Sequence, residues 1–165
     1  MEHAPSEHPW LVALEQSGLG AAMRQSELLY PGAEILHILG FVLLVGSIAG
    51  FDLRILGVNR RLPAPVFARH NVPLAMTGFF IAAPAGFLLF ATEATSIAVN
   101  TAFQIKLVCI ALGLVNAGLF HLGPWRDLDQ WGHTVTAPVP ARVGAVISLL
   151  AWTGAIIGGR LIAYL

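Results

Sequence analysis

The chain has 165 residues, of which 56% are hydrophobic and only 11% are charged, and its formal net charge is zero. A soluble domain carries about 25% charged residues, so this composition argues against a soluble protein and predicts an integral membrane protein. The zero net charge gives no electrostatic reason to expect a nucleic acid as partner. The single cysteine, Cys109, lies in an apolar run and excludes a disulfide framework.

Residues 1–30 are predicted to form a tail that precedes the membrane domain. Within this tail, residues 9–26 place Trp10, Leu11 and Leu14 on one face of a helix, while polar residues lie elsewhere. Such a pattern is typical of an amphipathic helix that lies on a membrane surface.

Residues 31–165 are predicted to form one domain of four membrane helices. A membrane helix needs about 20 mostly apolar residues, and the segments that meet this condition are 31–54, 70–92, 101–122 and 142–164. Two pairs of charged residues, Glu34 with Asp52 and Arg142 with Arg160, would each lie about 27 Å apart along a helix, close to the bilayer core thickness of about 30 Å. The sequence therefore predicts an all-α integral membrane four-helix bundle with an N-terminal interfacial amphipathic helix.

Basic residues predict the orientation of the bundle. The first and third loops hold most of them, namely Arg54, Arg60, Arg61, Arg69, Arg126 and Arg142. Cytoplasmic loops carry an excess of lysine and arginine, so these two loops are expected in the cytoplasm and both termini on the non-cytoplasmic side.

Small residues mark the predicted helix contacts. Gly46 and Gly50 have the GxxxG spacing in the first membrane helix, and the fourth has a ladder of Gly144, Ser148, Ala155 and Gly159. Such residues let helix backbones approach closely in lipid. They would equally leave a groove for a flat cofactor, and glycines alone do not decide between the two interpretations.

Ionisable residues inside the spans are the main candidates for a functional site, because a charge in hydrocarbon usually faces the bundle and has a partner. Glu34 and His37 share a helix face, Lys106 lies one turn into the third span, and Arg160 lies in the last turn of the fourth. We expect Glu34, His37 and Lys106 to form one polar site near the outer side. The alternative is that Lys106 and Arg160 only extend to the interface.

A second set of candidates lies near the inner side. His70 begins the second span, His121 ends the third at a similar depth, and Asn116 lies nearby. Two imidazoles on neighbouring helices are the minimal axial ligands for haem b, and they would also begin a copper or zinc site with His133 as a third ligand. His37 would then serve a second centre or handle protons beside a quinone. Alternatively, all these histidines only form local hydrogen bonds.

Several motifs resemble a family of small bacterial four-helix membrane proteins that is known as a domain of unknown function. The segments that carry the resemblance are Ser26–Pro31, Glu34–His37, Asp52–Gly57, Asn100–Lys106, Phe120–His121 and Gly159–Tyr164, with Gly46 and Asn116. The resemblance covers nearly the whole chain from Trp10 and implies a location in the bacterial inner membrane. The helix pattern is also distantly similar to copper-resistance D proteins and to b-type cytochrome membrane domains.

Three functions remain open from the sequence. The first is a redox or cofactor-binding protein, either a small b-type cytochrome or a subunit that interacts with quinone and with a membrane or periplasmic redox partner. The second is a transporter for copper or another small solute. The third is a non-catalytic subunit that docks through its glycine-rich faces into an oligomer or a larger complex. No phosphate-binding GxxxxGK loop, HExxH or GxSxG motif is present.

Overall fold

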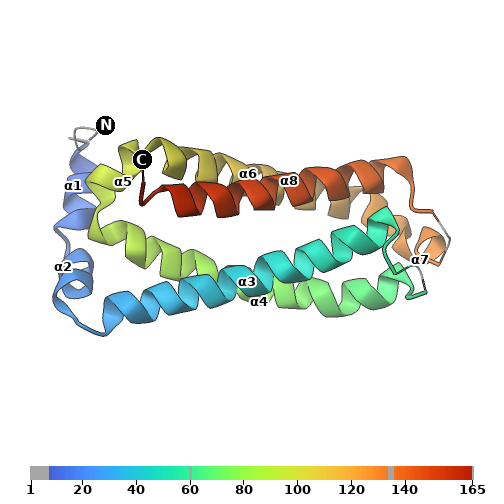
Figure 1. Cartoon of the computed structure of the whole chain (residues 1–165), viewed down its shortest axis with the longest axis horizontal. Helices are drawn as coiled ribbons and strands as arrows, with labels where there is room; N and C mark the ends of the chain where they lie inside the picture. The colour runs from blue at the N-terminus through green and yellow to red at the C-terminus, as the bar shows by residue number, and fades with distance from the viewer. Residues whose placement is uncertain (1–7, 60, 134–135, 165) are drawn as a thin grey trace.

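The computed structural model describes residues 8–59, 61–133 and 136–164, and the secondary structure of this part is entirely helical. The four long helices are α3 (Leu29–Leu56), α4 (Ala64–Thr92), α6 (Thr101–Leu122) and α8 (Val139–Leu161). The short ones are α1 (Pro9–Glu15), α2 (Gly18–Gln25), α5 (Ala94–Val99), the 3-10 helix η1 (Pro124–Asp127) and α7 (Leu128–Trp131). The long helices run along the long axis of the molecule, and the short ones lie at its two ends (Figure 1).

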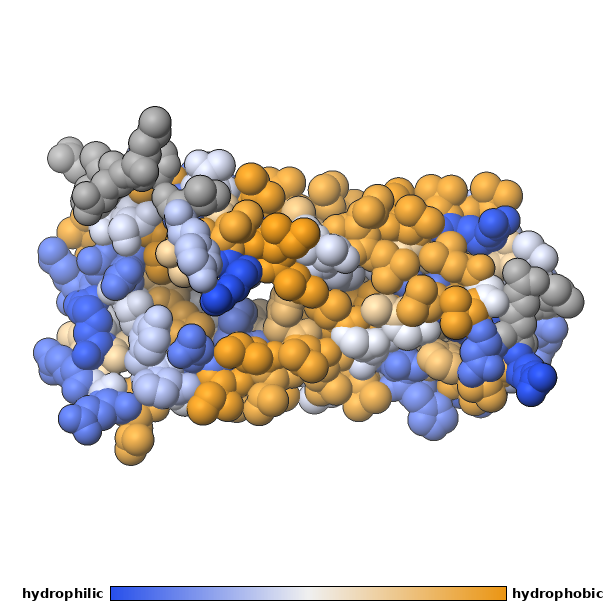
Figure 2. Space-filling model, in the orientation of Figure 1, coloured by the Kyte–Doolittle hydropathy of each residue, from blue (hydrophilic) through white to orange (hydrophobic). Residues whose placement is uncertain are grey.

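The four long helices confirm the predicted membrane bundle. Each is long and apolar enough to cross a bilayer, and only 11% of the most apolar stretch of α6 is buried inside the protein. Large apolar side chains cover the middle of the molecule, whereas polar residues gather toward its ends (Figure 2). Exposing so wide an apolar belt to water would cost a large free energy, so lipid must cover it. The chain is a multi-pass membrane protein.

Two of the predicted helix starts were several residues late. α4 begins at Ala64 rather than at residue 70, and α8 begins at Val139 rather than at 142. In both helices a proline lies in the first turn, where its missing N–H costs nothing because that donor has no partner within the helix. The prediction followed the uncharged run, but the helices continue through Arg69 and Arg142 toward the interface.

The N-terminal segment forms two helices instead of the single one predicted. The break is at Ser17, whose backbone is extended and whose hydroxyl accepts a hydrogen bond from the Gly20 amide. The hydroxyl also donates to the carbonyl oxygen of Leu14. Serine at this position is a favourable N-cap, so it ends α1 and starts α2.

The two N-terminal helices pack across one end of the bundle (Figure 1). Leu11 and Met23 are buried there. Arg24 donates to the carbonyl oxygen of Thr92 at 2.9 Å. Glu15 accepts hydrogen bonds from the backbone N–H and the hydroxyl of Thr95, and these bonds hold the pKa of the Glu15 carboxyl below its usual value. This segment is therefore bound to the bundle by specific contacts.

Helices α3 and α4 pack closely where Gly40 faces Gly78. A Cβ on Gly40 would lie 2.7 Å from the backbone nitrogen of Ala82, so no larger residue fits without a shift. The predicted GxxxG pair is not the point of closest approach, since Gly46 is exposed and has no described atom within 4 Å of its Cβ position. The pattern of spacing did not reveal which face of the helix meets its neighbour.

Helices α6 and α8 form the second tightly packed pair. Gly158 lies against the backbone of Ala102, and Gly113 provides the space for the indole ring of Trp152. The two pairs are joined through α3 and α8. Within the described part of the chain, α4 and α6 are not packed along their length. They meet near α5, where the rings of Phe90 and Phe103 stack with centroids 5.2 Å apart.

Candidate functional site

The separation of α4 from α6 leaves two neighbouring cavities in the bundle. One has a volume of about 520 Å³ and the other about 280 Å³, and both are lined by Leu44, Phe79, Leu114 and Trp152. The larger, called the His37 cavity, lies toward α5 and also contacts Trp10 of α1. The smaller, called the Asp52 cavity, lies toward η1 and α7. The walls of both are mainly apolar, so the few polar side chains in them determine what they can bind.

His37 is held in one orientation by α4. Its Nδ1 lies 2.7 Å from the carbonyl oxygen of Ala82. A carbonyl oxygen can only accept, so Nδ1 carries the hydrogen in this contact. The ring lies over Gly86, where an added Cβ would be 2.8 Å from Cε1. The other ring nitrogen, Nε2, is left to interact with the cavity.

Lys106 of α6 completes the polar end of this cavity. Its Nζ lies 3.4 Å from Nε2 of His37, which can accept a hydrogen bond from it. Lys106 is half-buried, and its stem lies along Gly158 and Gly159 of α8. His37 and Lys106 also line a third cavity of about 480 Å³ on the α8 side. The predicted association of these two residues is therefore present.

Glu34 and Arg160 do not join this pair. Glu34 is exposed, and among the described residues no carboxylate lies within ion-pair distance of Lys106. Glu34 lies nearer the end of α3, where its carboxylate reaches the interface and needs no protein partner. Arg160 is exposed and interacts with Tyr164, whose hydroxyl lies 3.0 Å from its Nη2. Lys106 is thus a half-buried cation without a described counter-anion.

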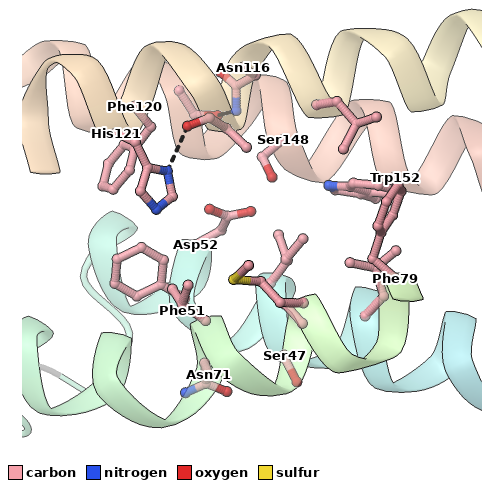
Figure 3. Close-up of a pocket in the computed structure, with 18 of the residues that line it drawn as sticks. Ser47, Phe51, Asp52, Asn71, Phe79, Asn116, Phe120, His121, Ser148 and Trp152 are labelled. Carbon is pink, nitrogen blue, oxygen red and sulfur yellow. Dashed lines mark hydrogen bonds between the residues drawn. The ribbon is translucent and has the colours of Figure 1, made fainter. Parts of the chain in front are cut away.

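The Asp52 cavity contains the most deeply buried carboxyl group of the described bundle. Asp52 is only 6% exposed, and its Oδ2 has no hydrogen-bond partner among the described residues. Figure 3 shows Asp52 extending from α3 toward Ser148 of α8 and toward His121 of α6. Asn116 also lines this cavity and donates from Nδ2 to the carbonyl oxygen of Gly144 at 3.1 Å.

His70 and His121 are not brought together over a common cavity. Both are exposed, and each ring uses Nδ1 to contact a carbonyl oxygen of its own helix, Val66 for His70 and Ala117 for His121. His121 lines the Asp52 cavity and stacks on Trp125, whereas His70 lines none of the three cavities.

The donors available for a metal ion are similarly dispersed. His133 is exposed in the segment that follows α7. Among the described residues, no group of three or more histidine, cysteine, aspartate or glutamate side chains is placed to hold a metal ion. The predicted donors His37, His70 and His121 thus lie on different parts of the bundle.

Two important residues of these cavities, Asp52 and Gly86, were not identified from the sequence. Asp52 was interpreted as a marker for the end of a span, although an acidic residue inside a membrane helix is itself a candidate for function. Its position in the predicted span 31–54 was the available signal. Gly86 carried no such signal, because the need for a glycine arises only when α3 brings His37 against α4.

Comparisons of the chain with models of known families, with curated proteins and with solved structures found no match.

Proposed function

We propose that this protein binds a lipid-soluble quinone in the His37 cavity, as a subunit or partner of a membrane redox system. The observation that carries the proposal is the pair formed by His37 and Lys106 at the polar end of this otherwise apolar cavity. A quinone has the matching shape, with polar carbonyl oxygens on a flat ring and a long apolar tail.

The chemistry of the two side chains suits a quinone head group. Lys106 would donate a hydrogen bond to a quinone oxygen and stabilise the negative charge that develops when the ring is reduced. His37 would exchange a proton through Nε2, because its Nδ1 is held by Ala82. A bound oxygen would also give Lys106 the acceptor that no described carboxylate provides.

The walls of the cavity fit the remainder of such a ligand. Phe41 lies between His37 and Trp152, with ring centroids 6.2 Å from each. Phe79 and Phe87 contribute further aromatic surface from α4. Aromatic side chains of this kind would hold a flat ring by stacking. The quinone tail would leave through the space between α4 and α6 into the acyl chains.

A haem-binding function receives less support. His70 and His121 have the free Nε2 atoms that axial ligation requires, but they do not line one cavity. The residues therefore do not fit a macrocycle clamped between these two histidines in this arrangement.

The bacterial inner membrane is the compartment that we propose, with both termini on its outer face. In this orientation the His37 cavity lies in the outer half of the bilayer, where a periplasmic redox partner would reach it. The arginine-rich first and third loops support the orientation.

Binding of a short-chain ubiquinone and of a short-chain menaquinone to the purified protein tests the proposal. Quenching of tryptophan fluorescence is a suitable signal, because Trp10 and Trp152 both line the cavity. Lys106→Met keeps the apolar stem and removes the donor, and should weaken binding by about tenfold, the value of one charged hydrogen bond. Arg160→Gln removes an exposed cation outside the cavity and should have no effect.

Two results would contradict the proposed function. One is that neither quinone binds more tightly than a quinone-free alkyl chain of the same length. The other is that Lys106→Met binds as well as the wild type. An absorption spectrum of the same preparation adds an independent check, since a Soret band with sharp bands on reduction would favour haem b instead.

A further inference from the structure

The Asp52 cavity has no role in the quinone proposal. Asp52 lies about 22 Å along α3 from His37, given 1.5 Å of rise per residue. Its carboxyl group is buried and one oxygen has no described partner. A buried polar group without a partner costs free energy. Such a group in a cavity calls for a ligand that supplies the missing interaction.

The chemistry of the neighbouring polar groups indicates a ligand that donates hydrogen bonds. Asn116 uses one of the two hydrogens on Nδ2 to donate to Gly144, and His121 uses Nδ1 on Ala117. A neutral His121 therefore offers only the acceptor Nε2 to its surroundings. Next to Asp52 the cavity therefore presents the acceptors Oδ2 of Asp52 and Nε2 of His121, with the Ser148 hydroxyl able to play either role.

The charges around the cavity indicate a cationic ligand. No lysine or arginine is among the residues that line it. The nearest arginine along the helix, Arg54, is buried but donates from Nε to the carbonyl oxygen of Leu62 in the first loop. With His121 neutral, an ionised Asp52 has no described counter-cation, and a bound cation would compensate the cost of burying its charge.

The apolar walls indicate an organic cation rather than a metal ion. Phe51, Phe79, Phe120 and Trp152 all line the cavity, and aromatic rings attract ammonium groups through their faces. The described residues hold no cluster of three acidic, histidine or cysteine side chains for a metal ion. The volume of about 280 Å³ suits a small molecule.

We propose that the Asp52 cavity binds a small organic ammonium ion that carries an aromatic or alkyl group. The ammonium group contacts Oδ2 of Asp52 and the acceptors of His121 and Ser148, and the apolar group lies among the aromatic side chains. The ligand enters from the bilayer through the gap between α4 and α6. This site is separate from the quinone site, so either proposal can fail without the other.

Calorimetric titration of the purified protein in an uncharged detergent with 2-phenylethylammonium tests this site. The neutral 2-phenylethanol and the anion phenylacetate have nearly the same shape and serve as charge controls. We expect the cation to bind the wild type at least about tenfold more tightly than the alcohol, since a hydrogen bond to a charged group is worth that factor. Phenylacetate should bind more weakly than both.

A pair of variants assigns the preference to Asp52. Asp52→Asn keeps the shape and removes the charge, so it should lose the preference for the cation over the alcohol. Glu34→Gln removes an exposed carboxylate from the same helix and should keep it. If the wild type binds the cation and the alcohol equally well, or if Glu34→Gln loses the preference as Asp52→Asn does, the proposal is overturned. The wild-type comparison stands even if Asp52→Asn does not fold.

Discussion

The position of His37 depends on a glycine in the neighbouring helix, and this dependence can be tested with Gly86→Ala. A Cβ at residue 86 would lie 2.8 Å from Cε1 and 2.9 Å from Nδ1 of His37. Carbon atoms in contact normally lie about 3.5–4.0 Å apart, so the ring must move away from α4 by about 0.7 Å. The carbonyl oxygen of Ala82 is on the same helix, so this movement also lengthens the hydrogen bond from Nδ1.

The expected loss of stability follows from these contacts. Overpacking costs about 1–3 kcal/mol, and the lost hydrogen bond adds about 1 kcal/mol. Alanine is a better helix former than glycine by about 1 kcal/mol, which offsets part of the loss. Gly86→Ala should therefore lower the free energy of unfolding by about 1–3 kcal/mol, and each kcal/mol should lower the melting temperature by about 2–4 °C.

Gly118→Ala is the matched control, because no described atom lies within 4 Å of the Cβ position at residue 118 in α6. This variant should melt at or slightly above the wild-type temperature. Nitrogen NMR of labelled histidine would show whether Nδ1 of His37 still carries the hydrogen. If Gly86→Ala is as stable as Gly118→Ala and His37 keeps its tautomer, the inferred packing of His37 on α4 is wrong.

Three further predictions address other parts of the molecule. Gly78→Ala should reduce stability by about 1–3 kcal/mol in chemical unfolding, because its Cβ would meet the backbone of α3, whereas Gly46→Ala should not. The hydrogen bonds from Thr95 lower the folded-state pKa of the Glu15 carboxyl below its usual value of 4.5. The stabilising effect of these bonds is therefore present above pH 4.5 and is lost as the pH falls through the folded-state pKa. Hydrogen exchange in α1, corrected for the intrinsic rate, should increase in that range, and an unchanged rate would contradict the contact. In a Cys109→Ser background, the thiol of Gln130→Cys should be labelled in intact cells only by a membrane-permeant thiol reagent, whereas that of Ser96→Cys should also react with an impermeant one. The reverse pattern of labelling would invert the proposed orientation.

The membrane helices were predictable because hydrocarbon imposes length and composition directly on the sequence. The spans around Leu44 and Ile110 follow from uncharged runs alone. The helix starts at Ala64 and Val139 were predicted late, because interfacial turns carry arginines that a search for apolar runs excludes. Proline in the first turn was a better marker of these starts than charge.

The candidate site was only partly predictable. The association of His37 with Lys106 could be expected, since two ionisable groups at similar depth need partners. Glu34 and Asp52 are eighteen residues apart, about five helical turns, so they lie on one face of α3. Glu34 is exposed and Asp52 is buried because other elements cover only one of the two ends of this face. Of the predicted GxxxG pair, Gly50 lies against Asn71 and Phe67 of α4 but Gly46 is exposed, and the closest contact with α4 is at Gly40. Local spacing does not show which part of a helix face its neighbours cover.

The unpacked seam between α4 and α6 also affects how affinities should be interpreted. A ligand that enters between α4 and α6 comes from the bilayer, where hydrophobic molecules reach concentrations far above those in water. The dissociation constant measured against total added ligand then contains the partition coefficient as a factor, and it changes with the amount of lipid or detergent. A site with weak intrinsic affinity can be fully occupied in a membrane. Comparisons among ligands at this seam therefore require concentrations expressed per volume of lipid.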